Sequence, residues 1–186
     1  MVTVRPARIQ DGPLIARMRA ASWRAAYDGI IPAGILAHLT APAAVAREAA
    51  WRSRHLPRGL LIAESAGPGG SAGEPAGFAA VGPQRGADGR PGPAPGQAEP
   101  GTARAELYAI YVVPQHWSTG AGRALMEAAL DWASAARYEE ICLWVLAENA
   151  RARRFYERAG FTRSGESEVR DDLGAVTEIR YRRPLS

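Results

Sequence analysis

Residues 103–146 form the block of sequence that most restricts how this chain can fold. Apolar content and alternation predict a long strand over residues 103–113, and an apolar stripe at helical spacing predicts a helix over residues 121–136. Residues 141–146 are apolar at almost every position, which is typical of a strand buried on both faces in a sheet interior. We therefore expect a sheet with helices packed on it.

The rest of the chain adds helices and strands in mixed order. Asp11 is expected to cap a helix that has Pro13 just inside it and extends to about Tyr27. Periodicity and turn residues predict strands over residues 2–5, 60–64, 76–81, 161–168 and 176–182, helices over residues 35–39, 40–55 and 149–159, and a Gly-rich turn over residues 67–73. This order predicts the α/β (α+β) fold class.

Residues 82–101 differ in kind from the rest. Eleven of these 20 residues are Gly or Pro, and alanine is almost the only apolar residue among them, so the stretch cannot form a packed core. Neither flanking part has enough strands to close a sheet alone. We therefore predict one domain over residues 1–186, with a flexible Gly/Pro-rich insertion at about residues 82–102.

Charge and composition exclude several classes of protein. All 23 basic residues are arginine, and 19 acidic residues leave a net charge of +4. Without lysine the chain can form neither a Schiff base nor a Walker-type phosphate loop. The basic excess is weak and shows neither aromatic-basic interleaving nor a recognition helix, so a nucleic-acid partner is not expected.

Cysteine and histidine usage narrows the chemistry further. Cys142 is the only cysteine, which excludes an intramolecular disulfide and a Cys-rich zinc site, and we expect it to be a core thiol. The histidines show no metal-ligand spacing, so we predict no metal. The lack of disulfides favours the cytoplasm. No uncharged apolar run approaches the roughly 18 residues of a membrane span, and the N-terminus has no apolar secretory segment.

The loop between the strand over 103–113 and the following helix is the best candidate for ligand binding. Gly120 and Gly122 flank the small Ala121, so backbone N–H groups can point into one concavity at the helix N-terminus, a site for phosphate. Arg123 and the hydroxyls of Ser118 and Thr119 could add contacts. A helix-start turn without a ligand is the alternative. Leu125 stands where the dinucleotide fingerprint requires a small residue.

Residues 106–161 resemble the core of the GCN5-related N-acetyltransferase (GNAT) superfamily. The resemblance lies in the strand over residues 106–114, the loop over 117–122, Asn149, and the segment 155–161. Arg5-Pro6-Ala7 followed by Asp11, and residues 23–32, also resemble bacterial members. The similarity covers most of the chain outside the Gly/Pro-rich stretch.

The resemblance implies a fold and an activity. The fold would be a mixed, mostly antiparallel twisted sheet of about seven strands with flanking helices and a central parallel pair, residues 108–113 and 141–145, that splays apart. Acetyl-CoA would lie between these strands and give its acetyl group to a primary amine of a small molecule or peptide by direct attack. Family members often form homodimers. The alternatives are an acyl-CoA-binding regulatory domain without turnover and an arginine-rich nucleic-acid-binding module.

The same resemblance assigns residues to the acetyl-CoA site. Trp117 stands where the family usually has Gln or Arg, and Ser118 where it often has Gly. Asn149 matches the residue that meets the pantetheine arm, with a helix N-cap as the alternative role. The full set is Ile110, Tyr111, Val112, Trp117, Ser118, Thr119, Gly120, Ala121, Gly122, Arg123, Asn149 and Tyr156.

Two residues are candidates for proton transfer. An alkylamine is mostly protonated at neutral pH, and Glu106 resembles a family base that would take the proton through water; the alternative is a carboxylate on the solvated face of a strand. Tyr156 resembles the family acid that protonates the departing thiolate; the alternative is a core aromatic. Trp23, Tyr27 and Asp28 would line the acceptor pocket, although packing in the core explains the first two equally well.

Overall fold

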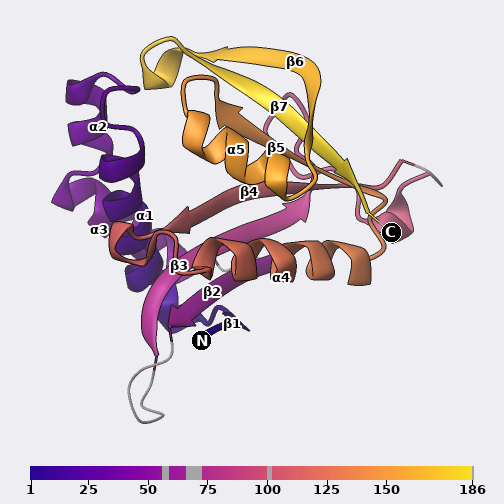
Figure 1. The fold of residues 1–186 in the computed structure, drawn as a ribbon, viewed down its shortest axis with the longest axis horizontal. Coiled ribbons are helices and arrows are strands. Elements are labelled where there is room, and N and C mark those ends of the chain that lie inside the picture. Colours follow the sequence, from indigo (N-terminus) through magenta and orange to yellow (C-terminus); the bar gives the residue numbers. More distant parts are fainter. Residues whose placement is uncertain (56–58, 66–72, 100–101, 186) are drawn as a thin grey trace.

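The computed structural model describes residues 1–55, 59–65, 73–99 and 102–185 (Figure 1). Strands and helices follow one another in the mixed order that the sequence predicts, which confirms the α/β fold class. The elements are β1 (Val2–Pro6), α1 (Gly12–Ala26), α2 (Ala33–Leu39), α3 (Pro42–Arg52), β2 (Gly59–Ser65), β3 (Glu74–Pro83), β4 (Arg104–Val112), α4 (Ala121–Ala135), β5 (Glu140–Leu146), α5 (Ala150–Arg158), β6 (Thr162–Arg170) and β7 (Val176–Pro184). The predicted turn over residues 67–73 lies outside the described residues apart from Gly73.

The seven strands form one sheet in the order β1-β2-β3-β4-β5-β7-β6. All neighbouring strands are antiparallel except β4 and β5, which run parallel. The helix α4 connects these two strands, as a parallel pair requires. The mixed, mostly antiparallel sheet with a central parallel pair is therefore confirmed.

Helices pack on both faces of the sheet. Successive side chains of a strand point to opposite faces, so neighbouring residues of one strand contact different helices. Leu61 packs in the core cluster that contains Leu125 of α4, whereas the adjacent Leu60 packs with Ile15 of α1. Tyr156 places α5 in the same cluster as α4. In Figure 1, α1, α2 and α3 gather at one side of the molecule, and α4 and α5 lie across the opposite face of the sheet.

The start of α1 differs from the sequence-based expectation. Asp11 occupies the N-cap position, but its side chain makes no hydrogen bond to the helix. Its carboxylate instead accepts hydrogen bonds from the Arg5 guanidinium, at 2.8 and 3.1 Å, and from the Arg8 backbone N–H, at 2.7 Å. An arginine fork binds both carboxylate oxygens more strongly than one helix N–H binds one of them, so Asp11 joins β1 to the helix rather than capping it.

The strands β4 and β5 separate after a short paired stretch. Their register ends at Glu106 opposite Cys142, although β4 continues to Val112 and β5 to Leu146. A β-bulge opposite Ala80 and Val81 of β3 adds Tyr108 as an extra residue of β4 and increases the local bend. Beyond Glu106, no described strand pairs with the edge of β4 that faces β5, so the predicted splay is present.

The Gly/Pro-rich stretch connects β3 to β4. Its first residues fold back as a narrow ribbon, in which Gln84 N–H donates to the Arg104 carbonyl at 2.9 Å and Gly86 N–H to the Arg90 carbonyl at 2.9 Å. This backbone pairing keeps Arg85 and its neighbours against the sheet. The flexibility of the stretch stays a prediction.

None of the helices within the described ranges is both long and apolar enough to cross a membrane.

Candidate active site

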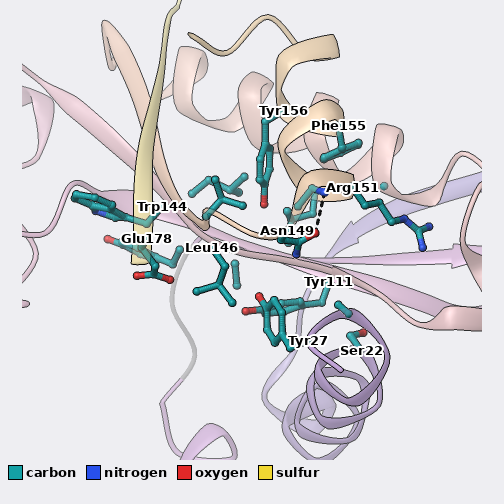
Figure 2. A pocket seen from close by; sticks show the side chains of 18 of the residues that line it. Ser22, Tyr27, Tyr111, Trp144, Leu146, Asn149, Arg151, Phe155, Tyr156 and Glu178 are labelled. Atoms are coloured by element: carbon teal, nitrogen blue, oxygen red, sulfur yellow. Dashed lines mark hydrogen bonds between the residues drawn. The ribbon is translucent and has the colours of Figure 1, made fainter. Parts of the chain in front are cut away.

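An open cleft of about 1260 Å³ lies where β4 and β5 separate. Its walls come from α1, the loop before α4, the start of α5, the β6–β7 pair and the beginning of the Gly/Pro-rich stretch. Figure 2 shows Tyr156 entering this space from α5 and Tyr27 and Tyr111 from the opposite side. The splay therefore brings together side chains that lie far apart in sequence.

Most of the residues predicted for the site line this cleft. Three predicted residues, Thr119, Ala121 and Asp28, do not line it. Ala121 is the first residue of α4 and is buried, and the Thr119 hydroxyl donates a hydrogen bond to the His116 carbonyl at 2.8 Å. The predicted residues that line it are Trp23, Tyr27, Glu106, Ile110, Tyr111, Val112, Trp117, Ser118, Gly120, Gly122, Arg123, Asn149 and Tyr156.

The loop before α4 has the backbone shape of an anion cradle. Ser118 and Gly120 have positive φ angles of 65° and 94°, which turns the chain sharply at the N-terminus of the 15-residue helix. A Cβ on Gly120 would meet no atom within 4 Å, so the space beside this backbone is open. Helix N-terminal amides facing open space attract anionic groups. Arg123, by contrast, pairs with Glu127 at 2.7 Å on the exposed side of the helix.

Trp117 is held rigidly at the entrance of this cradle. Its indole N–H donates to the Val112 carbonyl at 2.7 Å, and the Arg151 guanidinium stacks on its ring at 3.6 Å from the centroid. A stacked guanidinium keeps its N–H groups free for other ligands. The tryptophan that replaces the family's usual polar residue thus supports a cation from α5.

Three arginines of α5 face the cleft together. The sequence alone favours a solvated helix flank for them, with an approach of one or two of them to the 3′-phosphate of CoA as the alternative. Arg151, Arg154 and Arg158 are spaced three and four apart and therefore lie on one helix face. Within the described part of the chain, no carboxylate pairs with any of them, whereas other arginines of the cleft do have acidic partners. The sequence shows the spacing of these arginines, but it does not show that this face of α5 is directed toward the cleft.

Tyr156 is a buried aromatic residue that also lines the cleft. Its ring packs against Phe155 and Phe161, with centroids 5.4 and 6.1 Å away, and the residue is 8% exposed. Figure 2 shows its hydroxyl directed into the cleft, above Asn149. Burial raises the pKa of Tyr156 well above its usual value, and the nearby Tyr111 raises it further. The hydroxyl therefore keeps its proton at neutral pH and is available as a donor.

Asn149 caps α5 and lines the cleft at the same time. Its side-chain oxygen accepts a hydrogen bond from the Ala152 N–H at 3.0 Å. This bond satisfies one helix N–H and leaves the side-chain NH₂ group as a donor, so the N-cap role and a ligand contact are compatible.

The opposite wall of the cleft is aromatic. Trp23 contacts Tyr27 edge-on at 5.2 Å and Tyr111 at 6.4 Å between ring centroids. Burial of the Tyr27 hydroxyl and its interaction with Tyr111 raise the pKa of Tyr27 well above its usual value. The indole N–H of Trp23 is buried and has no hydrogen-bond partner among the described residues. This wall offers ring faces and hydroxyls to a bound molecule.

Glu106 is not on a solvated face of the strand. It is 2% exposed, and Arg85 contacts both of its oxygens: the Arg85 backbone N–H donates to Oε2 at 2.9 Å, and the Arg85 guanidinium donates to Oε1 through Nε at 3.1 Å and through Nη2. The same guanidinium lies 4.8 Å from the centroid of the Tyr108 ring. Arg85 belongs to the Gly/Pro-rich stretch, which therefore provides the counter-charge for the buried carboxylate.

The β5–β7–β6 side contributes cleft residues that the sequence interpretation missed, above all Glu178, Arg170 and Trp144. Glu178 of β7 lies opposite Leu146 of β5 in the strand register. The sequence predicted a strand over residues 176–182, but the neighbours of each face of that strand depend on the strand order.

Comparisons with known proteins agree with this geometry. Residues 23–161 match the model of the "Acetyltransferase (GNAT) family". The N-acetyltransferase YuaI of Bacillus subtilis (strain 168) is 33% identical over 153 residues, which cover 80% of this chain and 74% of that protein. The mycothiol acetyltransferase of Beutenbergia cavernae is 44% identical over 63 residues, 34% of this chain and 21% of that protein.

A solved structure shares the whole fold. The PaiA N-acetyltransferase from Thermoplasma acidophilum, determined in complex with coenzyme A, superposes with a TM-score of 0.62 at 18% identity, covering 97% of this chain and 98% of that one. The family model covers residues 23–161, which include most of the residues that line the cleft, and the Bacillus relative covers 80% of the chain, so the family assignment follows. The chain belongs to the acetyltransferase (GNAT) family and is an acyl-CoA-dependent N-acetyltransferase.

Proposed function

We propose that the cleft binds acetyl-CoA along the splayed strands and that the acceptor is a primary amine of a small molecule or peptide, which attacks the acetyl carbon directly. The observation that supports this most is the convergence of the anion cradle, the unpaired edge of β4 and the Tyr156 hydroxyl in one cleft. Acetyl-CoA supplies an activated acetyl group on a thiol that can leave.

The cleft offers hydrogen-bonding groups that match each part of acetyl-CoA. The amides before α4, together with the unpaired arginines of α5, suit phosphate groups. The backbone groups of β4 beyond Glu106 suit the amide-bearing arm of CoA, because that edge has no strand partner among the described residues. A backbone N–H near Ile110–Val112 then stabilises the negative charge that develops on the acetyl oxygen.

Tyr156 acts as the acid at the end of the reaction. It donates its hydroxyl proton to the sulfur as the bond between the acetyl carbon and the sulfur breaks, and it regains a proton from the attacking nitrogen. Trp23, Tyr27 and Tyr111 form the wall against which the acceptor lies. A cytoplasmic location and a homodimer remain predictions.

Binding and turnover can be tested separately. Acetyl-CoA at 100 times its Kd should stabilise the protein by about 2.7 kcal/mol in a thermal-shift titration. Release of free thiol with a panel of amines then measures turnover; the absence of lysine leaves the N-terminus as the chain's only primary amine, which keeps self-acetylation low. Binding without turnover on any amine would contradict the proposal and favour a regulatory acyl-CoA-binding domain.

The unpaired arginines of α5 provide a second test. Replacing Arg154 and Arg158 together with alanine should raise the KM for acetyl-CoA about tenfold, since solvent weakens charge-assisted hydrogen bonds to phosphate that are worth about 1.5–3 kcal/mol each when sheltered. The defect should shrink with 3′-dephospho-acetyl-CoA if these residues meet the 3′-phosphate. R163A, which removes an exposed arginine of β6 outside the cleft, is the matched control.

A further inference from the structure

Glu178 reaches the acceptor side of the cleft from β7. It lies opposite Leu146, the last residue of β5, and directly opposed residues of neighbouring strands point to the same face of a sheet. Figure 2 shows Glu178 beside Leu146, with Tyr27 and Tyr111 close by on the side of α1. The Glu178 side chain is 14% exposed. A carboxylate thus faces the space in which an acceptor would meet the aromatic wall.

One oxygen of Glu178 is available for a ligand. Its Oε2 accepts a hydrogen bond from Arg170 Nη1 at 2.9 Å, whereas Oε1 has no hydrogen-bond partner in the described part of the chain. Burial raises the pKa of Glu178 above its usual value, which strengthens it as a proton acceptor. In Glu106, by contrast, Arg85 occupies both oxygens.

Charged and titratable groups surround Glu178 from the packed elements. From β6, Arg170 lowers the pKa of Glu178 and Glu168 raises it; Asp172, in the turn after β6, also raises it. Tyr27, the residue directly after α1, interacts electrostatically with Glu178, and β5 presents the apolar Leu146. Arg170 and Glu168 therefore shift the pKa of the Glu178 carboxyl group in opposite directions.

We propose that Glu178 receives the proton that the acceptor amine loses before it attacks the acetyl group. This inference rests on the proposed transfer to a primary amine. An alkylammonium enters, one N–H bond breaks, and its proton forms an O–H bond with Oε1 of Glu178. The electron pair left on nitrogen then forms the bond to the acetyl carbon, and the proton on Glu178 passes to solvent through the open cleft.

The placement also identifies the acceptor class. A carboxylate near the Tyr27 ring binds a cation better than a neutral group. We therefore expect an aliphatic amine that arrives protonated. An aromatic amine, which is neutral at pH 7, or an alcohol of the same shape would gain less from this site.

The pH dependence of kcat/KM tests the assignment. Glu178 must be deprotonated to accept a proton, so wild-type activity should fall on the acidic side as pH drops through the pKa of Glu178. E178Q should lower kcat/KM about 10²-fold near neutral pH and abolish this acidic limb. R170Q should move the limb to higher pH and E168Q to lower pH, because they remove opposite influences on the pKa of Glu178.

Glu106, another carboxylate that lines the cleft, provides the comparison, since E106Q should retain the acidic limb. Acetyl-CoA affinity and thermal unfolding of E178Q should remain near wild type, which separates a catalytic defect from misfolding. Retention of the wild-type limb in E178Q, or its loss in E106Q, would overturn the assignment while transfer to amines stands. A wild-type protein that binds acetyl-CoA but acetylates no amine would overturn the proposed function as well.

Discussion

Replacing Tyr156 with phenylalanine is expected to lower kcat by about 10²-fold or more, while the affinity for acetyl-CoA stays near that of the wild type. The ring of Tyr156 packs in the core and its hydroxyl points into the cleft. Phenylalanine therefore keeps the packing and removes only the proton donor. Because burial raises its pKa, this hydroxyl stays protonated through the neutral range. Steady-state thiol release and equilibrium acetyl-CoA binding measure the two quantities separately.

Tyr181 offers a matched control. It is another buried tyrosine, 2% exposed, whose hydroxyl donates to Glu157 Oε1 at 2.8 Å and does not line the cleft. Y181F should lower the free energy of unfolding by about 1 kcal/mol and leave kcat unchanged. Equal turnover in Y156F and wild type would exclude the acid role of Tyr156.

Truncation of Arg85 to alanine should lower the free energy of unfolding by about 3 kcal/mol at pH 7, because it leaves a buried carboxylate without its counter-charge. The Glu106 side chain is 3% exposed and that of Arg85 is 45% exposed, so we expect the lower end of the range for a buried pair. Urea unfolding of the two proteins measures the difference.

A double-mutant cycle identifies the cause of this loss. A neutral glutamine side chain in place of the Glu106 carboxylate needs no counter-charge, so E106Q introduced into R85A should recover part of the lost stability, with a coupling free energy of about 1–3 kcal/mol. Additive losses in the double variant would mean that Arg85 stabilises the protein by a route other than Glu106, such as its contact with the Tyr108 ring.

The order of helices and strands could be predicted from local sequence. Residues 141–146 are apolar on both faces because β5 lies inside the sheet, and the expected helix over 121–136 agrees with α4 to within one residue. The helix over residues 40–55 was expected to be longer than α3, which ends at Arg52.

Some residues of the candidate site could likewise be predicted from the sequence, and others could not. The glycine loop before α4, Tyr156 and Asn149 were found in the sequence because their chemistry lies in short motifs at fixed spacing. Glu178 was not, because a single charged residue on a strand carries no local sign of what it faces.

The sequence by itself determined the fold class, the family motifs and the sharp glycine turn before α4, since each follows from side-chain periodicity or backbone freedom within a few residues. Only the tertiary structure decided that Arg85 occupies both carboxylate oxygens of Glu106, whereas Oε1 of Glu178 has no hydrogen-bond partner among the described residues. Arg85 and Glu106 are 21 residues apart in sequence and meet through the pairing of β3 with β4, whereas Glu178 enters the cleft because β7 pairs with β5. Strand order and register set these long-range contacts, and they depend on the packing of the whole sheet rather than on any local pattern.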